Sequence, residues 1–246
     1  MKKSFGKISE LYDEVRLDYP EELILDVIAM SNLSPKAKIL EVGIGTGKAT
    51  KAFAEKGYNL TALDVDKAQI LVAKKNLLEF SSIEYVVCAF EDYLPRNKFD
   101  LVFAAQTFHW IKPELRHKKV HVCLKIGGYL AVFSNFPSAT TKLEFEMRKL
   151  YAECPGFNKV DYATLNVLQE QLENSGFFEK VERRMYKRDI VYTREKYLGL
   201  VNSFSWISTL PELKKELLFE KVNELLGDNV SLLVPTESIL LLAKNK

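Results

Sequence analysis

The stretch Leu40-Glu41-Val42-Gly43-Ile44-Gly45-Thr46-Gly47 decides the fold of this chain. It joins an apolar run, 39–42, to a helix-like stretch, 48–56, through three glycines at every second position. Glycine adopts positive φ and carries no Cβ, so the backbone of such a turn can press against a ligand. Open α/β sheets bind their ligands there, beyond the carboxyl end of the first strand. The sequence therefore predicts a ligand-binding loop at 43–47.

Spacing separates the nucleotide-type ligands that such a loop can hold. A phosphate-binding P-loop requires G-x-x-x-x-G-K-[S/T], but Val42 stands in place of its first glycine and Ala49 in place of its hydroxyl residue. The dinucleotide fingerprint requires G-x-G-x-x-G/A. Gly43 and Gly45 fit it, whereas the third position is Lys48, which is too bulky for close packing of helix on strand. The pattern excludes the P-loop and disfavours a dinucleotide.

A second acid, Asp64, closes the apolar run 60–63. It follows the loop by about 20 residues, where a carboxylate at the end of the second strand accepts hydrogen bonds from ribose hydroxyls. The same charge would repel a 2′-phosphate, which disfavours an NADP-type ligand. Asp66 is better placed than Asp64 to cap the helix expected to begin at Lys67. We therefore predict that Asp64 binds a ribose.

From residue 38 onward, apolar strand-like runs alternate with amphipathic stretches, which is typical of an α/β fold with a parallel sheet. The expected strands are 38–42, 59–64, 83–88, 99–104 and 128–134, and the expected helices are 47–56, 67–79 and 113–125. After Pro137 we expect helices at 141–152, 162–175, 194–207 and 211–226, and strands at 180–192 and 237–244. The late helices interrupt the end of the sheet, so they are expected to cover the binding pocket.

Five motifs follow one another along this core: ILEVGIGTG (39–47), LTALDVD (60–66), VVCAFED (86–92), FDLVFAAQTFHWI (99–111) and LKIGGYLAVF (124–133). In order and spacing the sequence resembles the class I S-adenosylmethionine-dependent methyltransferases. The segment YDEVRLDYP (12–20) looks like the stretch that precedes the core in members acting on small molecules. The resemblance is strong over about residues 38 to 135.

The resemblance implies a doubly wound, Rossmann-like α/β fold. Its seven-stranded sheet would be mostly parallel with an antiparallel closing strand, and a helical cap would be inserted. One methyltransferase domain would span 1–246. Within it, 1–37 would form N-terminal lid helices, 38–135 the cofactor-binding core, and 136–246 the substrate-side helices and closing strands.

S-adenosylmethionine is the cofactor that the resemblance implies. The loop backbone would face its methionine part, Asp64 its ribose, and Val65 with 89–91 its adenine, whereas Tyr12 and Arg16 would close over its carboxylate. Phe90 would stack on the adenine or fill the core, and Tyr12 and Arg16 would otherwise be surface residues. The residues expected to bind the cofactor are Tyr12, Arg16, Glu41, Gly43, Ile44, Gly45, Gly47, Asp64, Val65, Ala89, Phe90, Glu91, Ala105 and Gln106.

A sulfonium methyl group is already activated, so the enzyme chiefly aligns nucleophile, methyl carbon and sulfur. His109, in the loop after the fourth strand, could take a proton from a hydroxyl or acid acceptor, or it could shape that loop through hydrogen bonds. His117 and His121 lie four residues apart on a predicted helix, but no glutamate follows His117 as H-E-x-x-H requires. No metal site is expected.

The amino-acid composition limits the classes of partner and compartment that we expect for this chain. Lys+Arg 35 against Asp+Glu 33 leaves a net charge of +2, whereas a nucleic-acid binder usually carries a basic excess. No apolar run approaches the length of a membrane span, and the three cysteines suggest no disulfide framework. We expect a cytoplasmic enzyme that methylates an oxygen or nitrogen of a small molecule. The alternatives are an NAD-dependent oxidoreductase on the same scaffold, a methyltransferase acting on a macromolecule such as tRNA, and a non-catalytic module that binds the cofactor.

Overall fold

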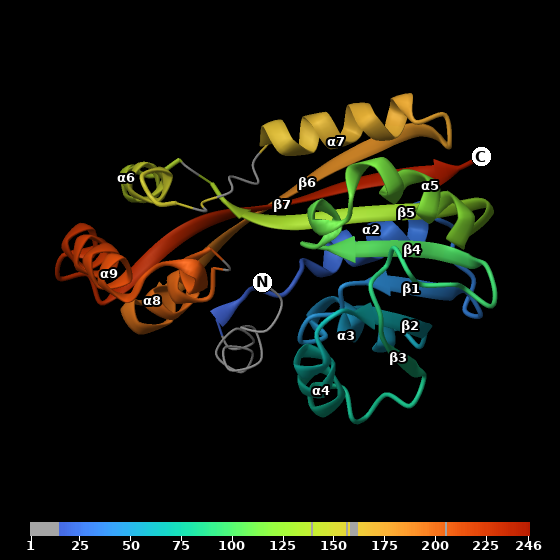
Figure 1. The fold of residues 1–246 in the computed structure, drawn as a ribbon, viewed down its shortest axis with the longest axis horizontal. Helices are drawn as coiled ribbons and strands as arrows, with labels where there is room; N and C mark the ends of the chain where they lie inside the picture. The colour runs from blue at the N-terminus through green and yellow to red at the C-terminus, as the bar shows by residue number, and fades with distance from the viewer. Residues whose placement is uncertain (1–14, 139, 156, 158–161, 205) are drawn as a thin grey trace.

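A computed structural model describes residues 15–138, 140–155, 157, 162–204 and 206–246. Its centre is a seven-stranded sheet in the order β3-β2-β1-β4-β5-β7-β6 (Figure 1). The strands are β1 (Lys38–Val42), β2 (Asn59–Asp64), β3 (Ile83–Val87), β4 (Phe99–Ala105), β5 (Leu124–Pro137), β6 (Phe178–Thr193) and β7 (Ser231–Asn245). Neighbours from β3 to β5 pair in parallel, and β7 runs antiparallel to both β5 and β6. The predicted α/β fold is confirmed.

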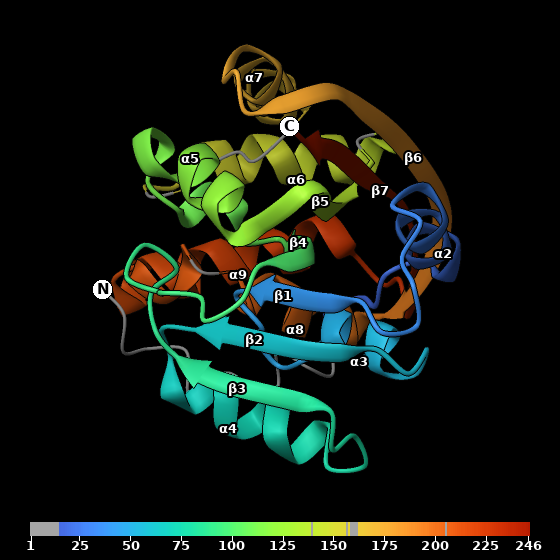
Figure 2. The same cartoon turned by 90° about the vertical axis from the view of Figure 1, so that its right-hand side faces the viewer.

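Helices cover both faces of the sheet. They are α2 (Glu21–Met30), α3 (Lys48–Ala54), α4 (Lys67–Asn76), α5 (Pro113–Cys123), α6 (Lys142–Ala152), α7 (Tyr162–Asn174), α8 (Arg194–Asn202) and α9 (Glu212–Leu226), with short 3-10 turns at η1 (Phe108–Trp110) and η2 (Ile207–Thr209). Side chains of α2, α3 and α4 share one apolar cluster, which lies on one face of the sheet. Those of α5 and α7 share another cluster, on the opposite face. In Figure 2, β1, β2 and β3 lie side by side with α4 against β3.

Alternation along the central strands assigns residues to the two faces. Ile39 and Phe103 belong to the cluster under α2, α3 and α4, whereas Leu40 and Val102 belong to the one under α5 and α7. Both sets are fully buried. This is why these strands read as continuous apolar runs, as strands covered on both faces do.

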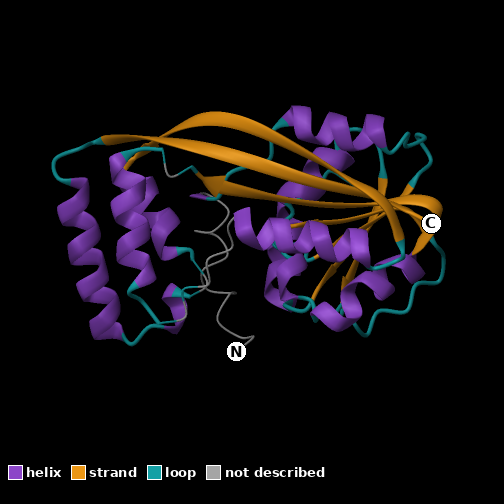
Figure 3. Cartoon of the chain, turned by 90° about the horizontal axis from the view of Figure 1, so that it is seen from above, coloured by secondary structure: helices purple, strands orange, loops and turns teal. Residues whose placement is uncertain are grey.

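Beyond this core, three strands continue into a cap. β5, β6 and β7 have 14, 16 and 15 residues, against 5 to 7 in the other four strands. Figure 3 shows them running without a break from the core to the helices α6, α8 and α9. These helices and the far ends of β6 and β7 enclose a third apolar cluster. The cap lies on the side toward which the carboxyl ends of β1 and β4 point (Figure 1).

The last strand begins earlier than predicted, at Ser231 rather than at residue 237. Residues 235–237, Pro-Thr-Glu, interrupt the apolar pattern in the sequence, yet they pair with β6 on one side, and Thr236 and Glu237 pair with β5 on the other. On the cap side, Leu232 and Val234 are buried while Leu233 is exposed. The strand therefore follows a half-buried alternation there, which a search for continuous apolar runs overlooks.

The segment before α2 joins the cap to the core. Val15 is buried in the cap cluster, and the Tyr19 ring meets Phe133 edge-on, with ring centroids 4.8 Å apart. Between them, Asn135 Nδ2 lies 3.4 Å from Leu17 O and 3.5 Å from Asp18 O. α2 itself packs through Leu23, Ile24 and Val27 into the core cluster. No helix among the described residues has the length and apolar character that crossing a membrane requires.

We expect the ring stack at the centre of the core to dominate stability. Phe103 is fully buried between Phe53 and Phe133, with ring centroids 4.7 and 5.7 Å away. Phe103→Ala should lower the free energy of unfolding by about 3–5 kcal/mol in urea titrations, because it removes buried area and leaves a cavity. Phe145→Ala is the matched control: Phe145 is 51% exposed, so about 1 kcal/mol or less is expected. Equal losses would contradict this assignment of the core.

Candidate functional site

The loop after β1 needs its three glycines for different reasons. Gly43, Gly45 and Gly47 have φ of 81°, 56° and 92°, which residues with a Cβ rarely adopt. A Cβ on Gly43 would lie 2.5 Å from Thr107 Cγ2, and one on Gly47 would lie 2.7 Å from Leu77 Cδ1. A Cβ on Gly45 would meet no described atom within 4 Å. Two glycines therefore allow close packing inside the protein, and Gly45 turns its bare face to open space.

Asp64, at the carboxyl end of β2, holds the same loop. Its Oδ2 accepts a hydrogen bond from Gly45 N at 3.0 Å, and its Oδ1 accepts one from Asp66 N at 2.9 Å. A carboxylate offers about four lone-pair sites, so acceptor capacity remains for a ligand beside the backbone hydrogen bonds from Asp66, Gly45 and Val65. Burial raises the pKa of this carboxyl, and the backbone hydrogen bonds from Asp66 and Gly45 oppose that rise. The loop and the predicted ribose acceptor thus form one unit.

Glu41 is fully buried one residue before the end of β1. The Thr50 hydroxyl, from α3, donates a hydrogen bond to Glu41 Oε2. Burial raises the pKa of Glu41 well above its usual value, and the charge of Asp64 raises it further. Glu41 therefore fixes α3 against β1 behind the glycine loop. The sequence pattern did not reveal this partner, because Thr50 carries no mark of its own within the helix.

The end of β4 lies beside the end of β1. Thr107 Oγ1 donates to Val42 O at 2.5 Å, and the Thr107 side chain covers Gly43. Gln106 has a φ of 59°, and Gln106 Nε2 reaches Asn135 O at 3.5 Å. A non-glycine residue in this region is strained, and such strain clusters at functional sites. Ala105, just before it, is buried. Thr107 was missed by the sequence analysis, although a threonine just past a strand end can hold a neighbouring strand in this way.

The residues expected around the adenine differ in accessibility. Val65, next to Asp64, is 47% exposed. Phe90 is 3% exposed inside the cluster under α5 and α7, which places it among the core residues. Ala89 and Glu91 are half-buried, and Glu91 Oε1 lies 3.4 Å from Lys112 N. Of this group, Val65 offers an apolar surface to a ligand.

Arg16 contacts the end of α8 and not the glycine loop. Its Nε donates to Ser203 Oγ at 2.9 Å and its Nη2 to Ser203 O at 3.2 Å, while the guanidinium stands 5.0 Å from the Phe204 ring centroid. In this structure it therefore fastens the N-terminal segment to the end of α8. Tyr12, its expected companion, lies outside the described residues.

The three histidines occupy different environments. His109, in η1, lies beside Trp110, with ring centroids 5.1 Å apart and ring planes tilted by 39°. Burial, with the nearby charge of Arg116, lowers its pKa to about 4; the same causes lower that of His117 to about 4. His121 Nδ1 lies 2.8 Å from Asn245 Oδ1, so it joins α5 to the end of β7. The described residues contain no group of His, Cys, Asp and Glu that could hold a metal ion.

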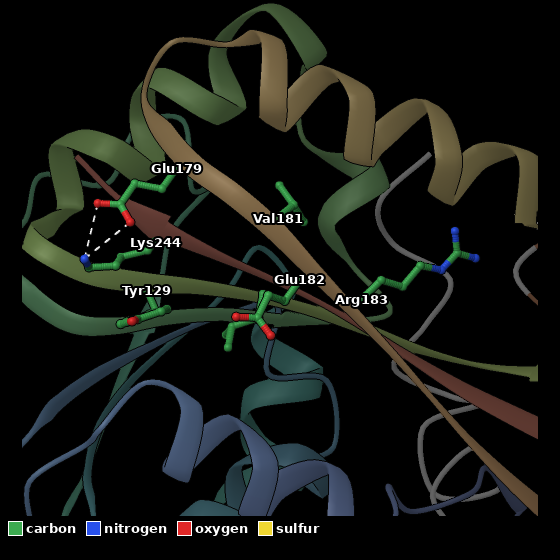
Figure 4. A pocket seen from close by; sticks show the side chains of 7 residues that line it. Tyr129, Glu179, Val181, Glu182, Arg183 and Lys244 are labelled. Atoms are coloured by element: carbon green, nitrogen blue, oxygen red, sulfur yellow. Dashed lines mark hydrogen bonds and ion pairs between the residues drawn. The ribbon is translucent and has the colours of Figure 1, made fainter.

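A surface hollow lies away from these residues (Figure 4). It is lined by Tyr129, Glu179, Val181, Glu182, Arg183, Leu242 and Lys244, with an ion pair between Lys244 and Glu179 at 3.2 Å. Tyr129 pairs with Leu101, which pairs with Ile39 near the start of β1. The hollow therefore lies toward the amino ends of the parallel strands. Ligands of open α/β sheets bind at the carboxyl ends, so we assign the site to the glycine loop.

The lowered pKa of His109 gives a pH dependence of stability. The unfolded imidazole binds a proton below about pH 6.5, whereas the folded one does so only below about pH 4. Acidification from pH 7 to 4.5 should therefore lower the free energy of unfolding of the wild type by about 2 kcal/mol more than that of the His109→Asn variant. Urea titrations at both pH values measure this difference. Raised carboxyl pKa values act in the opposite direction in both proteins and cancel in the comparison. A pH-independent difference would contradict the burial of His109.

Comparison with known proteins supplies independent evidence. Residues 40–132 match the model of a methyltransferase domain. An uncharacterized methyltransferase of Schizosaccharomyces pombe is 27% identical over 220 residues, which cover 87% of this chain and 84% of that protein. Malonyl-[acyl-carrier protein] O-methyltransferase 1 of Ilyobacter polytropus is 36% identical over 116 residues, but these cover 45% of this chain and 41% of that protein.

Solved structures share the fold. A phosphoethanolamine N-methyltransferase of Haemonchus contortus, solved with phosphomonomethylethanolamine and S-adenosylhomocysteine, matches with a TM-score of 0.57 and 13% identity over 98% of this chain and 57% of that one. The domain match and the relatives that span most of the chain agree with the motif order at the glycine loop. The domain match over residues 40–132, the relatives that span most of the chain and the shared fold together support a class I S-adenosylmethionine-dependent methyltransferase.

Proposed function

We propose that this enzyme binds S-adenosylmethionine at the loop 43–47 and transfers its methyl group to an oxygen or nitrogen of a small molecule. The observation that carries the proposal is the bare face of Gly45, whose amide is tied to the Asp64 carboxylate. A backbone face without a side chain admits the amino-acid part of the cofactor, and an adjacent carboxylate suits its ribose. These features fit the cofactor that the family implies.

Each part of the cofactor has a candidate partner. The backbone at Gly43, Ile44 and Gly45 would hold the methionine part, and the free lone pairs of Asp64 would accept from the ribose hydroxyls. Val65, with 47% of its surface exposed, would cover one face of the adenine. The cofactor supplies an activated methyl group. The strained turn at Gln106 and the clamp from Thr107 to Val42 would keep the surrounding backbone rigid.

The residues of the chain then have three tasks: orienting the acceptor, excluding water and managing a proton. The cap and the segment 15–20 stand beyond the carboxyl ends of the strands (Figure 1), where they can enclose both substrates. His109 is uncharged at pH 7 because its pKa is about 4. Such an imidazole accepts a hydrogen bond but holds a proton weakly, so it is a poor base toward an alcohol. Acceptors that are already nucleophilic at neutral pH, such as a carboxylate or a neutral amine, fit best.

The acceptor is expected to be small. The net charge of +2 on 246 residues provides no electrostatic footprint for a nucleic acid. One relative is named for a malonyl group on a carrier protein, but the match covers less than half of either protein. The proposal about the acceptor therefore rests on the cap helices of this chain and not on that relative.

Calorimetry with S-adenosylhomocysteine tests the donor site. Wild-type protein should bind it, and Asp64→Asn should weaken binding about 10- to 100-fold, because hydrogen bonds to a charged group contribute about 1.5–3 kcal/mol. Asp228→Asn, an exposed site in the turn after α9, is the control and should leave the affinity unchanged. Binding of NAD in place of S-adenosylhomocysteine would overturn the proposal.

A second pair of variants tests the bare face of the loop. Gly45→Ala and Gly57→Ala both place a side chain at positive φ in open space, so each should lower the free energy of unfolding by about 1–2 kcal/mol. Only Gly45→Ala should weaken S-adenosylhomocysteine, by about tenfold or more, since its methyl group occupies ligand space. Equal affinities in the two variants would show that the ligand lies elsewhere.

A further inference from the structure

The inner face of β6 carries a row of residues, three of them polar, that the proposed donor site does not use. Tyr186, Arg188, Ile190 and Tyr192 alternate along the strand and point to one side, as residues two apart in a strand do. The hydroxyl of Tyr186 donates to Asp26 Oδ2 at 2.5 Å. Arg188 Nε and the Tyr192 hydroxyl, in contrast, are buried and have no hydrogen-bond partner among the described residues.

Unpartnered buried polar atoms need an explanation, since the great majority in folded proteins are satisfied. Tyr192 is only 4% exposed and lies in the cap cluster. The hydroxyl of the neighbouring Tyr197, in contrast, has an acceptor, because it donates to Glu144 Oε1 at 3.0 Å. The two tyrosine rings stand 6.1 Å apart, edge to face. Tyr192 is thus held in place by packing, and its buried hydroxyl has no acceptor among the described residues.

Two guanidinium charges act on that hydroxyl. Burial raises the pKa of Tyr192 to about 12, and the charges of Arg16 and Arg188 oppose the rise. Arg188 Nη2 donates to Asp18 O at 2.9 Å, which fixes the guanidinium and leaves Nε directed elsewhere. Glu144 is the acidic group that acts on Tyr192, and its carboxyl already accepts the hydrogen bond of Tyr197. The two guanidinium groups on the inner side of the cap favour an anionic ligand.

This row is connected to the donor site. Asp18, which accepts from Arg188, is ion-paired with Lys48 at 3.0 Å, and Lys48 directly follows Gly47. A second route crosses the sheet: Arg188 Nη2 lies 3.5 Å from Ser238 Oγ, and Ser238 Oγ donates to Asn135 Oδ1 at 2.5 Å. Asn135 O in turn lies 3.5 Å from Gln106 Nε2. Arg188 is thus linked to both edges of the proposed donor site.

We propose that Arg188 Nε and the Tyr192 hydroxyl bind a carboxylate group of the methyl acceptor. Each is a hydrogen-bond donor without an acceptor, a carboxylate accepts from both kinds of donor, and the charge-assisted hydrogen bond from arginine is the stronger of the two. The proposal rests on the proposed function, because the acceptor must approach a methyl donor at the glycine loop. The apolar cap cluster around Tyr192 would receive the carbon skeleton of the acid.

The test uses full-length protein saturated with S-adenosylhomocysteine. Ligand-observed NMR and calorimetry would compare 4-hydroxybenzoate, cinnamate, octanoate and glutarate with their amides, and with phenyl phosphate. We expect at least one acid to bind at least tenfold more tightly than its amide. Arg188→Gln and Arg188→Lys should each weaken that acid at least tenfold, since both remove Nε, and Tyr192→Phe should weaken it several-fold.

Lys187→Gln is the matched control, because Lys187 is adjacent on the same strand but its side chain is 76% exposed and faces the other side. It should leave the affinity for the acid unchanged. Binding of acids and amides alike, no binding of any acid, preference for phenyl phosphate, or insensitivity to both Arg188 variants would overturn the carboxylate assignment. Affinity for S-adenosylhomocysteine, measured first in every variant, separates this failure from failure of the donor site and from loss of folding.

Discussion

One hydrogen bond, from the amide of Gly45 to the carboxylate of Asp64, connects the two halves of the donor site. It ties the loop after β1 to the end of β2. The backbone amides of Gly43 and Ile44 strengthen the same junction, each reaching Leu63 O at 2.8 Å. Because the loop is held from this side, its opposite face stays bare. Preorganisation of this kind reduces the ordering cost of binding.

The sequence predicted the features that depend on local backbone geometry. Glycines at 43, 45 and 47 and an acid at the end of the next strand are constraints of the chain itself, and the structure places them side by side. The parallel strands were predicted as well, β1 and β4 most directly, because burial on both faces leaves continuous apolar runs there. The helix cap at Asp66 also follows from local chemistry, since its side chain accepts from Ala68 N.

Side-chain positions that depend on residues far away in the sequence could not be predicted. Glu41 was expected near the cofactor, but its partner is Thr50 behind the loop. Arg16 was expected over the cofactor carboxylate, and in the structure it is held by Ser203, 187 residues away in the sequence. Phe90 could stack or fill the core, and only the packing of α5 and α7 decides that it is buried. Side-chain direction in a segment without periodicity cannot be derived from one sequence.

The unbroken passage of β5, β6 and β7 from core to cap has a mechanical consequence. A domain connected by loops can swing about a few flexible bonds, but this cap is fused to the core by three paired strands. Any motion of the cap relative to the core must bend the three hydrogen-bonded strands together. Helices α6, α8 and α9 are attached at its far end, so under the proposed function their substitution would change the choice of acceptor and leave the loop 43–47 intact.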